Sequence, residues 1–280
     1  MKSMEVKAPA KINIGLKILS KRPDGFHNLS TLFYPINDLY DVLSFEPSDR
    51  FEFFCDSESA PKDDSNLVVK ANDLLNMTTG STLNVRITLE KRIPSQAGLG
   101  GGSSDAAATL KSLNELFRLE LNHQQLMDLA LQLGSDVPFF IGSSPSIGES
   151  RGEILHKINL HIEEPILIVN PMINISTKEA FQNISGHGIV LEYNNFVSNG
   201  HLNYAKMREE VQNDFEDYVF GKYPEIGNIK TLIYENGALF SLMSGSGSTV
   251  YGMFSNLESA VLAAQKIPPE YFVFISNPHD

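Results

Sequence analysis

Cysteine is nearly absent from this sequence. Cys55 is the only one in 280 residues, so the chain cannot form a disulfide within itself. No group of cysteine and histidine residues has the spacing of a zinc site either. These absences are typical of a protein that works in a reducing compartment, and we expect a cytoplasmic location.

Long apolar runs are missing as well. The first stretch, MKSMEVKAPAKINIGL, contains no continuous apolar core of signal-peptide length. Elsewhere no apolar run approaches the roughly 18 residues of a membrane-spanning helix. We therefore expect neither a membrane span nor a membrane partner.

Basic residues are outnumbered by acidic ones. The chain has 22 lysines and arginines against 34 aspartates and glutamates, a net charge of −12, which argues against nucleic acid as a partner. Its 42% hydrophobic and 20% charged residues are ordinary for a folded protein. A length of 280 residues corresponds to one or two domains of about 150 residues each.

The alternation of apolar and polar residues predicts a strand at 11–18. One face of this strand carries only isoleucine and leucine, which predicts that the strand is half-buried. Alternate residues of a strand lie about 6 to 7 Å apart, so Lys11 and Asn13 project side by side from the polar face. A Pro-Asp-Gly turn signal follows at 22–25.

A strand, a glycine-rich loop and a helix are predicted one after another. Apolar residues alternate over 83–89 and then recur at three- and four-residue spacing over 106–117, with Ser103, Ser104 or Asp105 as the helix N-cap or in its first turn. Glycines let the backbone approach a ligand, and a helix N-terminus adds amide donors and a favourable dipole. We therefore expect the loop to bind phosphate, with a flexible turn as the alternative. The loop reads Gly98-Leu99-Gly100-Gly101-Gly102-Ser103-Ser104.

Two familiar nucleotide-binding loops do not fit this one. The Walker pattern needs Gly-Lys followed by serine or threonine, and the only Gly-Lys pair is followed by Tyr223. The dinucleotide pattern needs glycine or alanine at its last position. Started at Gly98 it ends on Ser103, and started at Gly100 it ends on Asp105.

The remaining segments intermix strands and helices, which predicts an α+β fold. A helix over 123–133 that ends at Gly134 places Asp136 at the junction to the next element. We expect a first domain over residues 1–157 and a second over 158–280. Further helices are expected at 204–220 and 225–236 and strands at 165–169, 238–243 and 249–254, with a glycine-rich turn at 245–248 and a final helix and strand.

Several motifs together resemble one family. The run PSQAGLGGGSSDAA at 94–107 resembles the ATP phosphate-binding motif of the GHMP kinases. The other segments, in this order and spacing, resemble the 4-diphosphocytidyl-2-C-methyl-D-erythritol kinase family of that superfamily, over nearly the whole chain. They are APAKIN at 8–13, RPDGFH at 22–27, GSDVPFF at 134–140, NDFE at 213–216 and MSGSG at 243–247.

The resemblance implies a two-domain α+β GHMP kinase fold with mixed sheets and helices, and an active site in the cleft between the domains. It also implies an ATP-dependent enzyme that uses Mg²⁺. The expected reaction phosphorylates the 2-hydroxyl of 4-diphosphocytidyl-2-C-methyl-D-erythritol, a step of the non-mevalonate pathway to isoprenoid precursors. The partner would be this small cytidine-diphosphate-linked polyol, and the chain would be a monomer or a weak homodimer.

The resemblance further implies roles for individual residues. Asp136 takes the proton of the substrate hydroxyl, and Lys11 beside it stabilises the carboxylate and the developing negative charge. These roles suit the chemistry, because an alcohol needs a carboxylate to accept its proton while cations neutralise the moving phosphoryl group. Ser104 is the candidate residue near Mg²⁺. The residues expected to bind ATP are Asn66, Leu67, Pro94, Ala97, Gly98, Leu99, Gly100, Gly101, Gly102, Ser103 and Ser104.

The family places an aromatic ring and a histidine at the cytosine base, which here are Phe26 and His27. The Thr-x-x-x-Phe spacing of Thr177 and Phe181 matches the segment that supplies a second ring, so a sandwich of the base is expected. Asn13 is expected to reach the methylerythritol hydroxyls. The family usually has tyrosine where this chain has Phe26; the change keeps the stacking surface and removes a phenolic hydrogen bond.

Two other functions are considered. One is another GHMP kinase that acts on homoserine or mevalonate, or a diphosphomevalonate decarboxylase, but a small acyclic acid needs no cytosine platform such as Phe26 and His27. The other is a nucleotide-binding protein without transfer activity, which would have no use for a proton acceptor such as Asp136 together with Lys11.

Overall fold

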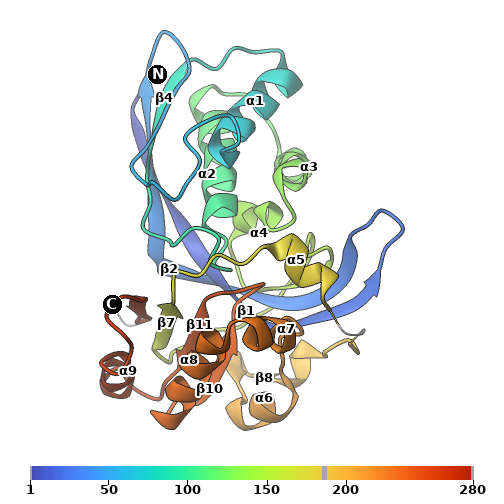
Figure 1. The fold of residues 1–280 in the computed structure, drawn as a ribbon. Helices are drawn as coiled ribbons and strands as arrows, with labels where there is room; N and C mark the ends of the chain where they lie inside the picture. The colour runs from blue at the N-terminus through green and yellow to red at the C-terminus, as the bar shows by residue number, and fades with distance from the viewer. Residues whose placement is uncertain (1, 185–187, 279–280) are drawn as a thin grey trace. The chain divides into compact units, whose positions relative to one another are not determined.

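The computed structural model describes residues 2–184 and 188–278, which form two compact units that interleave along the chain (Figure 1). The first unit comprises residues 1–10, 35–95 and 100–144, and the second comprises 11–34, 96–99 and 145–280. They interleave because two long strands, β1 (Met4–Lys21) and β2 (His27–Pro47), each contribute to both units. The expected domains, 1–157 and 158–280, are each one continuous stretch of the chain, and this division stays a prediction.

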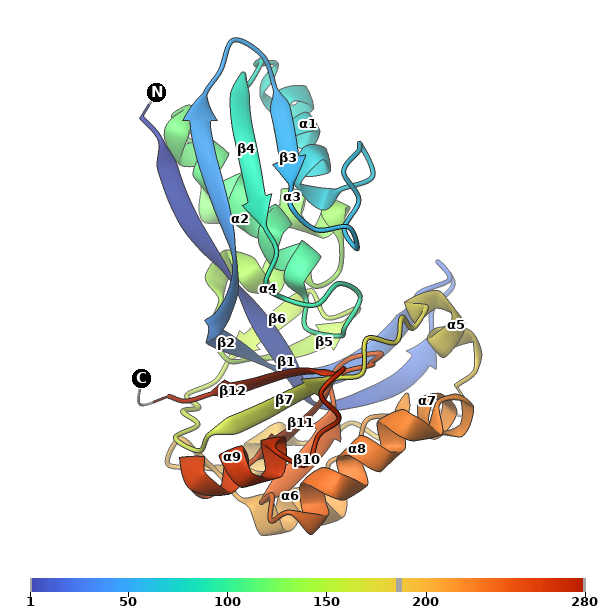
Figure 2. The same cartoon turned by 60° about the vertical axis from the view of Figure 1, so that its left-hand side comes forward.

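The first unit combines strands with four helices. Strand β4 (Val85–Glu90) pairs antiparallel with the second half of β2 and parallel with β3 (Glu52–Cys55). Its predicted alternation is confirmed, because every second residue is buried. Helices α1, α2 and α3 lie on one side of β3 and β4 (Figure 2). The helices are α1 (Leu67–Thr79), α2 (Gly101–Leu116), α3 (His123–Leu133) and α4 (Val137–Gly142).

Helix α2 begins earlier than its apolar spacing indicates. Its N-cap is Gly100 in a left-handed conformation (φ 73°), which a glycine adopts without strain. Ser103 and Ser104 therefore lie in the first turn of the helix, one of the two placements expected. The other predicted helix of this unit, α3, has the expected bounds and ends at Gly134.

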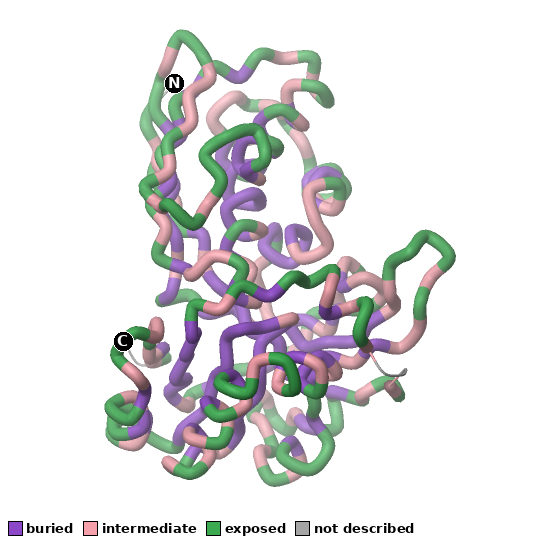
Figure 3. The backbone as a smooth tube through the Cα atoms, viewed as in Figure 1, coloured by how far each residue is buried: buried purple, intermediate pink, exposed green. Residues whose placement is uncertain are grey.

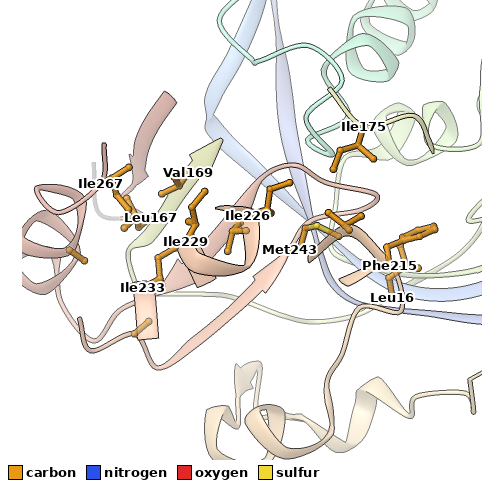
Figure 4. Close-up of a cluster of buried hydrophobic side chains, with 14 of the residues drawn as sticks. Leu16, Leu167, Val169, Ile175, Phe215, Ile226, Ile229, Ile233, Met243 and Ile267 are labelled. Atoms are coloured by element: carbon orange, nitrogen blue, oxygen red, sulfur yellow. The ribbon is translucent and has the colours of Figure 1, made fainter. Parts of the chain in front are cut away.

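The second unit is built on an antiparallel sheet of order β10-β11-β7-β12. Helix α8 (Pro224–Glu235) packs on β10 and β11, and α9 (Leu257–Ala264) packs on β7 and β12. Leu167 and Val169 of β7 gather with Ile226, Ile229 and Ile233 of α8 in one buried cluster (Figure 4). The strands of this sheet are β7 (Ile166–Asn170), β10 (Phe240–Met243), β11 (Val250–Met253) and β12 (Phe272–Ser276).

Smaller elements complete the second unit. Strands β5 (Ser146–Ser150) and β6 (Ile154–Lys157) form a hairpin, and β5 pairs with the first half of β2. The tip of the β1–β2 hairpin is exposed (Figure 3). The other elements are α5 (Thr177–Gln182), a 3-10 turn at Tyr193–Asn195, β8 (Val197–Ser198), β9 (His201–Leu202), α6 (Tyr204–Glu210) and α7 (Glu216–Lys222).

The single helix expected at 204–220 is wrong, because α6 and α7 are separated by residues 211–215. This segment pairs with β1 instead of continuing the helix. The Leu16 N–H donates to the Gln212 carbonyl, and the Asp214 N–H donates to the Leu16 carbonyl, both at 2.9 Å. Tertiary pairing thus overrides the helical periodicity.

The strand expected at 11–18 is confirmed as part of β1, but the expectation that it is half-buried is wrong. Lys11 and Asn13 on its polar face are each only 2% exposed, as deeply buried as the isoleucines on the other face. Hydrogen bonds to buried groups of the second unit replace the water that the prediction assumed there. Within the two described ranges of the chain, no helix is both long and apolar enough to cross a membrane.

Candidate active site

Lys11 and Asn13 form the centre of a buried polar network in the second unit. The Lys11 ammonium donates to Asn13 Oδ1 at 2.6 Å and to the Gly98 carbonyl at 2.9 Å. Asn13 Nδ2 donates to Thr31 Oγ1 at 2.9 Å, and this hydroxyl donates to the Gly15 carbonyl at 2.6 Å. Buried polar groups are held rigidly when each has such partners, so the network fixes where the lysine points.

The start of the glycine loop belongs to the same network. Backbone bonds at 2.9 and 3.2 Å join the Lys11 N–H to the Leu99 carbonyl and the Thr249 N–H to the Ala97 carbonyl. Gly98 has φ 77°, and a Cβ there would collide with the carbonyl oxygen of Ser244. Only glycine fits this position.

The second glycine-rich turn lies beside Asn13. Ser244 Oγ accepts from the Asn13 N–H at 3.1 Å and donates to the Gly98 carbonyl at 2.8 Å. Asn213 stabilises this turn, because its Nδ2 donates to the carbonyls of Met243 and Gly245, each at 2.8 Å. The structure thus brings the NDFE and MSGSG motifs together with Lys11 and the start of the glycine loop at Gly98.

The rest of the glycine loop opens α2 in the first unit. Gly101 and Ser104 are buried, whereas Gly102 is exposed and its Cβ would meet nothing closer than Leu67 Cδ1 at 3.8 Å. The first backbone N–H groups of a helix have no partner within it and favour an anion. This part of the loop is therefore suited to phosphate.

Ser104 carries an observation that bears on Mg²⁺. Its hydroxyl is buried and has no hydrogen-bond partner within the described residues. A hydroxyl oxygen is a suitable ligand for Mg²⁺, so the residue fits the expected role. Nowhere in the described ranges do three or more histidine, cysteine, aspartate or glutamate side chains gather to hold a metal.

The first unit contains a buried ion cluster that includes Asp105 in the second turn of α2. Lys91 forms ion pairs with Asp41 and, at 2.9 Å, with Asp105 of α2. Asp41 also accepts backbone N–H bonds from Arg92 and Ile93 at 2.6 and 2.8 Å, whereas Asp105 Oδ1 has no partner in the described part of the chain. Burial raises the pKa of Asp105 to about 7, although the Lys91 charge opposes this shift.

The predicted adenine-side residues also lie in the first unit. Asn66 is the N-cap of α1: its side chain accepts from the Val68 N–H at 2.9 Å and donates to the Pro61 carbonyl at 2.6 Å. This capping explains why an asparagine stands there. Leu67 and Pro94 are partly exposed. Adenine binding by these residues stays a prediction.

Asp136 occupies the N-cap position of α4 in the first unit. Capping is the usual reason for an aspartate at this position, but its side chain makes no capping hydrogen bond to any residue that the structure describes. The residue is partly exposed. Helix capping therefore does not account for this carboxylate.

The predicted base-binding residues lie in the second unit. The His27 ring stacks on Phe181 with centroids 4.9 Å apart and planes 13° apart, and Phe215 meets the Phe181 ring edge-on at 4.9 Å. Thr177 shares a hydrogen bond of 2.9 Å with Ser246 of the second turn. Phe26 is 48% exposed at the hairpin tip. The ring stacked on Phe181 is thus the imidazole, and a base sandwich with Phe26 stays a prediction.

Sequence reasoning missed several residues of these networks. Ser244 and Asn213 lie inside the MSGSG and NDFE motifs, so those motifs were the signal that could have identified them. Thr31 and Lys91 lie outside any motif, and their partners are 18 and 50 residues away in the chain. Only the folded chain reveals such pairs.

Two family models match the chain. The model of the GHMP kinases N terminal domain matches residues 66–143, and the model of the GHMP kinases C terminal domain matches residues 196–273. The first match includes the glycine loop from Pro94 and the α4 junction at Asp136.

Named relatives agree with these matches. The chain is 40% identical to the 4-diphosphocytidyl-2-C-methyl-D-erythritol kinase of Chlorobium chlorochromatii, over 96% of this chain and 94% of that protein. A crystal structure of 4-(cytidine 5'-diphospho)-2C-methyl-D-erythritol kinase superposes with a TM-score of 0.82 at 33% identity, over 97% of this chain and 98% of that one.

A more distant structure shows the fold alone. The homoserine kinase of Cytophaga hutchinsonii superposes with a TM-score of 0.61 at only 18% identity, over 99% of this chain and 95% of that one. The expected α+β GHMP kinase fold is confirmed, and the chain belongs to the 4-diphosphocytidyl-2-C-methyl-D-erythritol kinase family of the GHMP kinases.

Proposed function

We propose that this chain transfers the terminal phosphoryl group of ATP to the 2-hydroxyl of 4-diphosphocytidyl-2-C-methyl-D-erythritol. The observation that carries the proposal is the burial of Lys11, which is 2% exposed and joined to both Asn13 and the Gly98 carbonyl of the glycine loop. Lysines are almost never buried without a specific partner. A lysine held against a phosphate-type loop suits phosphoryl transfer, and the names of the relatives supply the acceptor.

Asp136 is the proposed general base. Its carboxylate accepts the proton of the acceptor hydroxyl as the new oxygen–phosphorus bond forms, and this proton transfer makes the alcohol a competent nucleophile. Lys11 is proposed to neutralise the negative charge on the carboxylate and on the moving phosphoryl group.

The backbone N–H groups of residues 98–104 are proposed to hold the ATP phosphates, with Asn66, Leu67 and Pro94 on the adenine side. When bound, Mg²⁺ supplies positive charge that offsets the charge of the phosphates. Ser104 is the proposed protein contact of the metal, and its unpartnered buried hydroxyl within the described ranges supports this assignment.

The acceptor is proposed to bind to residues of the second unit. Asn13 would contact the methylerythritol hydroxyls, and Phe26, His27 and Phe181 would bind the cytosine by stacking and by hydrogen bonds to its edge. Thr177 would support Phe181 from the start of the same helix, α5. The stacked rings of His27 and Phe181 support an aromatic site here.

The proposal also includes the setting of the enzyme. We propose a monomer or weak homodimer in the cytoplasm that acts on a small molecule and binds neither nucleic acid nor membranes. The net charge of −12 and the single cysteine support this setting.

The test is ADP formation from ATP and Mg²⁺ with a panel of acceptors. The panel contains 4-diphosphocytidyl-2-C-methyl-D-erythritol, the same polyol phosphate without its cytidine, mevalonate and homoserine. Turnover with the cytidylated acceptor alone is expected. Turnover with mevalonate or homoserine would replace the proposed acceptor, and ADP formation independent of every acceptor would contradict phosphoryl transfer to an alcohol.

A further inference from the structure

The second unit contains an ion pair to which the proposed reaction gives no role. Lys230 of α8 pairs with Glu216 of α7 at 2.6 Å, and only 23% and 12% of their side-chain surfaces are exposed. Two charges lose much of their hydration when they are buried in this way. Such a pair therefore indicates a role beyond the packing of α8 on its sheet.

The Glu216 carboxylate holds the backbone at the start of the second glycine-rich turn. Its Oε1 accepts from the Met243 N–H at 2.9 Å, while its Oε2 accepts from the Lys230 ammonium. Burial raises the pKa of the Glu216 carboxyl, and the Lys230 charge opposes this shift. Because an ionised carboxylate is a stronger acceptor than a neutral group, Lys230 strengthens the bond between Glu216 and Met243.

The next residue, Ser244, joins this turn to the network around Lys11. Ser244 Oγ accepts from the Asn13 N–H at 3.1 Å and donates to the Gly98 carbonyl at 2.8 Å. The Lys11 ammonium donates to the same Gly98 carbonyl at 2.9 Å and to Asn13 Oδ1 at 2.6 Å. A shift of the backbone at Met243 would therefore reach two groups that accept hydrogen bonds from Lys11.

We propose that Glu216 and Lys230 are positioning residues that hold the Lys11 ammonium in place for phosphoryl transfer. They act through the turn at 243–245, and all the residues of this path belong to the second unit. The inference rests on the proposed function. Because a displacement of about 1 Å can lower the rate of a catalysed reaction by about a hundredfold, loss of either residue should lower kcat.

The test compares kcat and the KM of ATP for the full chain and three variants, Lys230→Met, Glu216→Gln and Lys17→Met. Methionine keeps an unbranched side chain without the charge, and glutamine keeps the shape of glutamate as a neutral amide. Lys17 is the matched control, because it pairs with Asp214 at 2.8 Å with 13% and 17% of their side-chain surfaces exposed. Circular dichroism first establishes that each variant is folded at the assay temperature.

Lys230→Met is expected to lower kcat by about 10- to 100-fold, with the KM of ATP within about twofold of the wild type. Glu216→Gln should lower kcat by at least about threefold, because a neutral amide oxygen accepts more weakly. Lys17→Met should keep kcat within about twofold of the wild type. Wild-type kcat in either Lys230→Met or Glu216→Gln would overturn the inference. So would a loss in Lys17→Met as large as that in Lys230→Met.

Chemical rescue separates positioning from a general loss of stability. Glu216 and Lys230 line a cavity of about 610 Å³ whose wall includes the exposed residues Gln212 and Asp217, so a small solute can reach the carboxylate. Methylammonium should raise the kcat of Lys230→Ala by at least about threefold, because it brings N–H donors to Glu216. Tetramethylammonium carries the same charge without such donors and should not raise it.

The same rescue experiment shows which proposal fails. Equal responses of Lys230→Ala to the two cations, or no response to either, would overturn the positioning role and leave the proposed function intact. Absence of wild-type turnover with the cytidylated acceptor would overturn both proposals.

Discussion

Replacing Asp105 by asparagine tests the buried ion cluster that Asp105 forms with Lys91 and Asp41. Asp105 is 2% exposed, pairs with Lys91 and leaves one oxygen without a partner in the described part of the chain. Burial raises its pKa from 3.8 to about 7. The folded protein therefore binds this proton more tightly than the unfolded chain does. This tighter proton binding by Asp105 stabilises the folded state fully below pH 3.8, and the stabilisation is lost as the pH rises through about 7.

The magnitude follows from the size of the shift. At about 1.4 kcal/mol per pH unit, a carboxyl whose pKa rises from 3.8 to about 7 costs the folded state on the order of 4 kcal/mol when it is ionised. Asparagine resembles the protonated acid in size and cannot ionise. The stability of Asp105→Asn relative to the wild type should therefore rise by about 2 to 3 kcal/mol between pH 5 and pH 8.

The assay is urea denaturation of both proteins at pH 5, 6, 7 and 8, with the difference in unfolding free energy taken at each pH. Taking the difference removes the contribution of the other carboxyl groups to the pH dependence, because those groups titrate in both proteins. Asp73→Asn on the exposed side of α1 is the control for loss of one negative charge and should shift stability by no more than about 0.5 kcal/mol at any pH. A difference for Asp105→Asn that does not change with pH would refute the reasoning.

Three further substitutions test the site itself. Asp136→Asn should lower kcat by about 10²- to 10⁴-fold while calorimetry finds ATP binding unchanged; a normal rate would exclude it as the base. Gly98→Ala should destabilise the fold by about 2 to 4 kcal/mol, because φ is 77° and the new Cβ would collide with Ser244. Gly102→Ala is the control and should keep the wild-type melting temperature. Equal melting temperatures for the two variants would contradict the packing described at Gly98. Phe181→Ala should raise KM of the acceptor by about 5- to 150-fold, and an unchanged KM would remove this ring from the base site.

Local patterns predicted those parts of the fold that depend on local rules. Helix α3 has its expected bounds because an apolar periodicity ends at Gly134, and β4 alternates because only one of its faces is buried. The motif containing Gly98 predicted a glycine-rich loop for the same reason. Glycines that adopt positive φ leave a mark in the sequence wherever the backbone must turn tightly.

Tertiary contacts decided the parts that the patterns could not predict. The burial of Lys11 depends on Gly98, 87 residues away. The break between α6 and α7 depends on the pairing of residues 211–215 with β1, which no helical periodicity contains. The contact of Arg151 with Phe26 likewise joins two hairpins that are far apart in the chain. Residue spacing alone carries no information about such long-range partners.

The most direct test of the proposed reaction is the ³¹P NMR spectrum of the product formed from 4-diphosphocytidyl-2-C-methyl-D-erythritol, ATP and Mg²⁺. Carbon 2 of this acceptor bears a methyl group and no hydrogen, so a phosphate on its oxygen has no proton three bonds away. A new monophosphate signal is expected, and it should be a singlet without proton decoupling. A new signal split by proton coupling would place the phosphate on another hydroxyl and contradict the account.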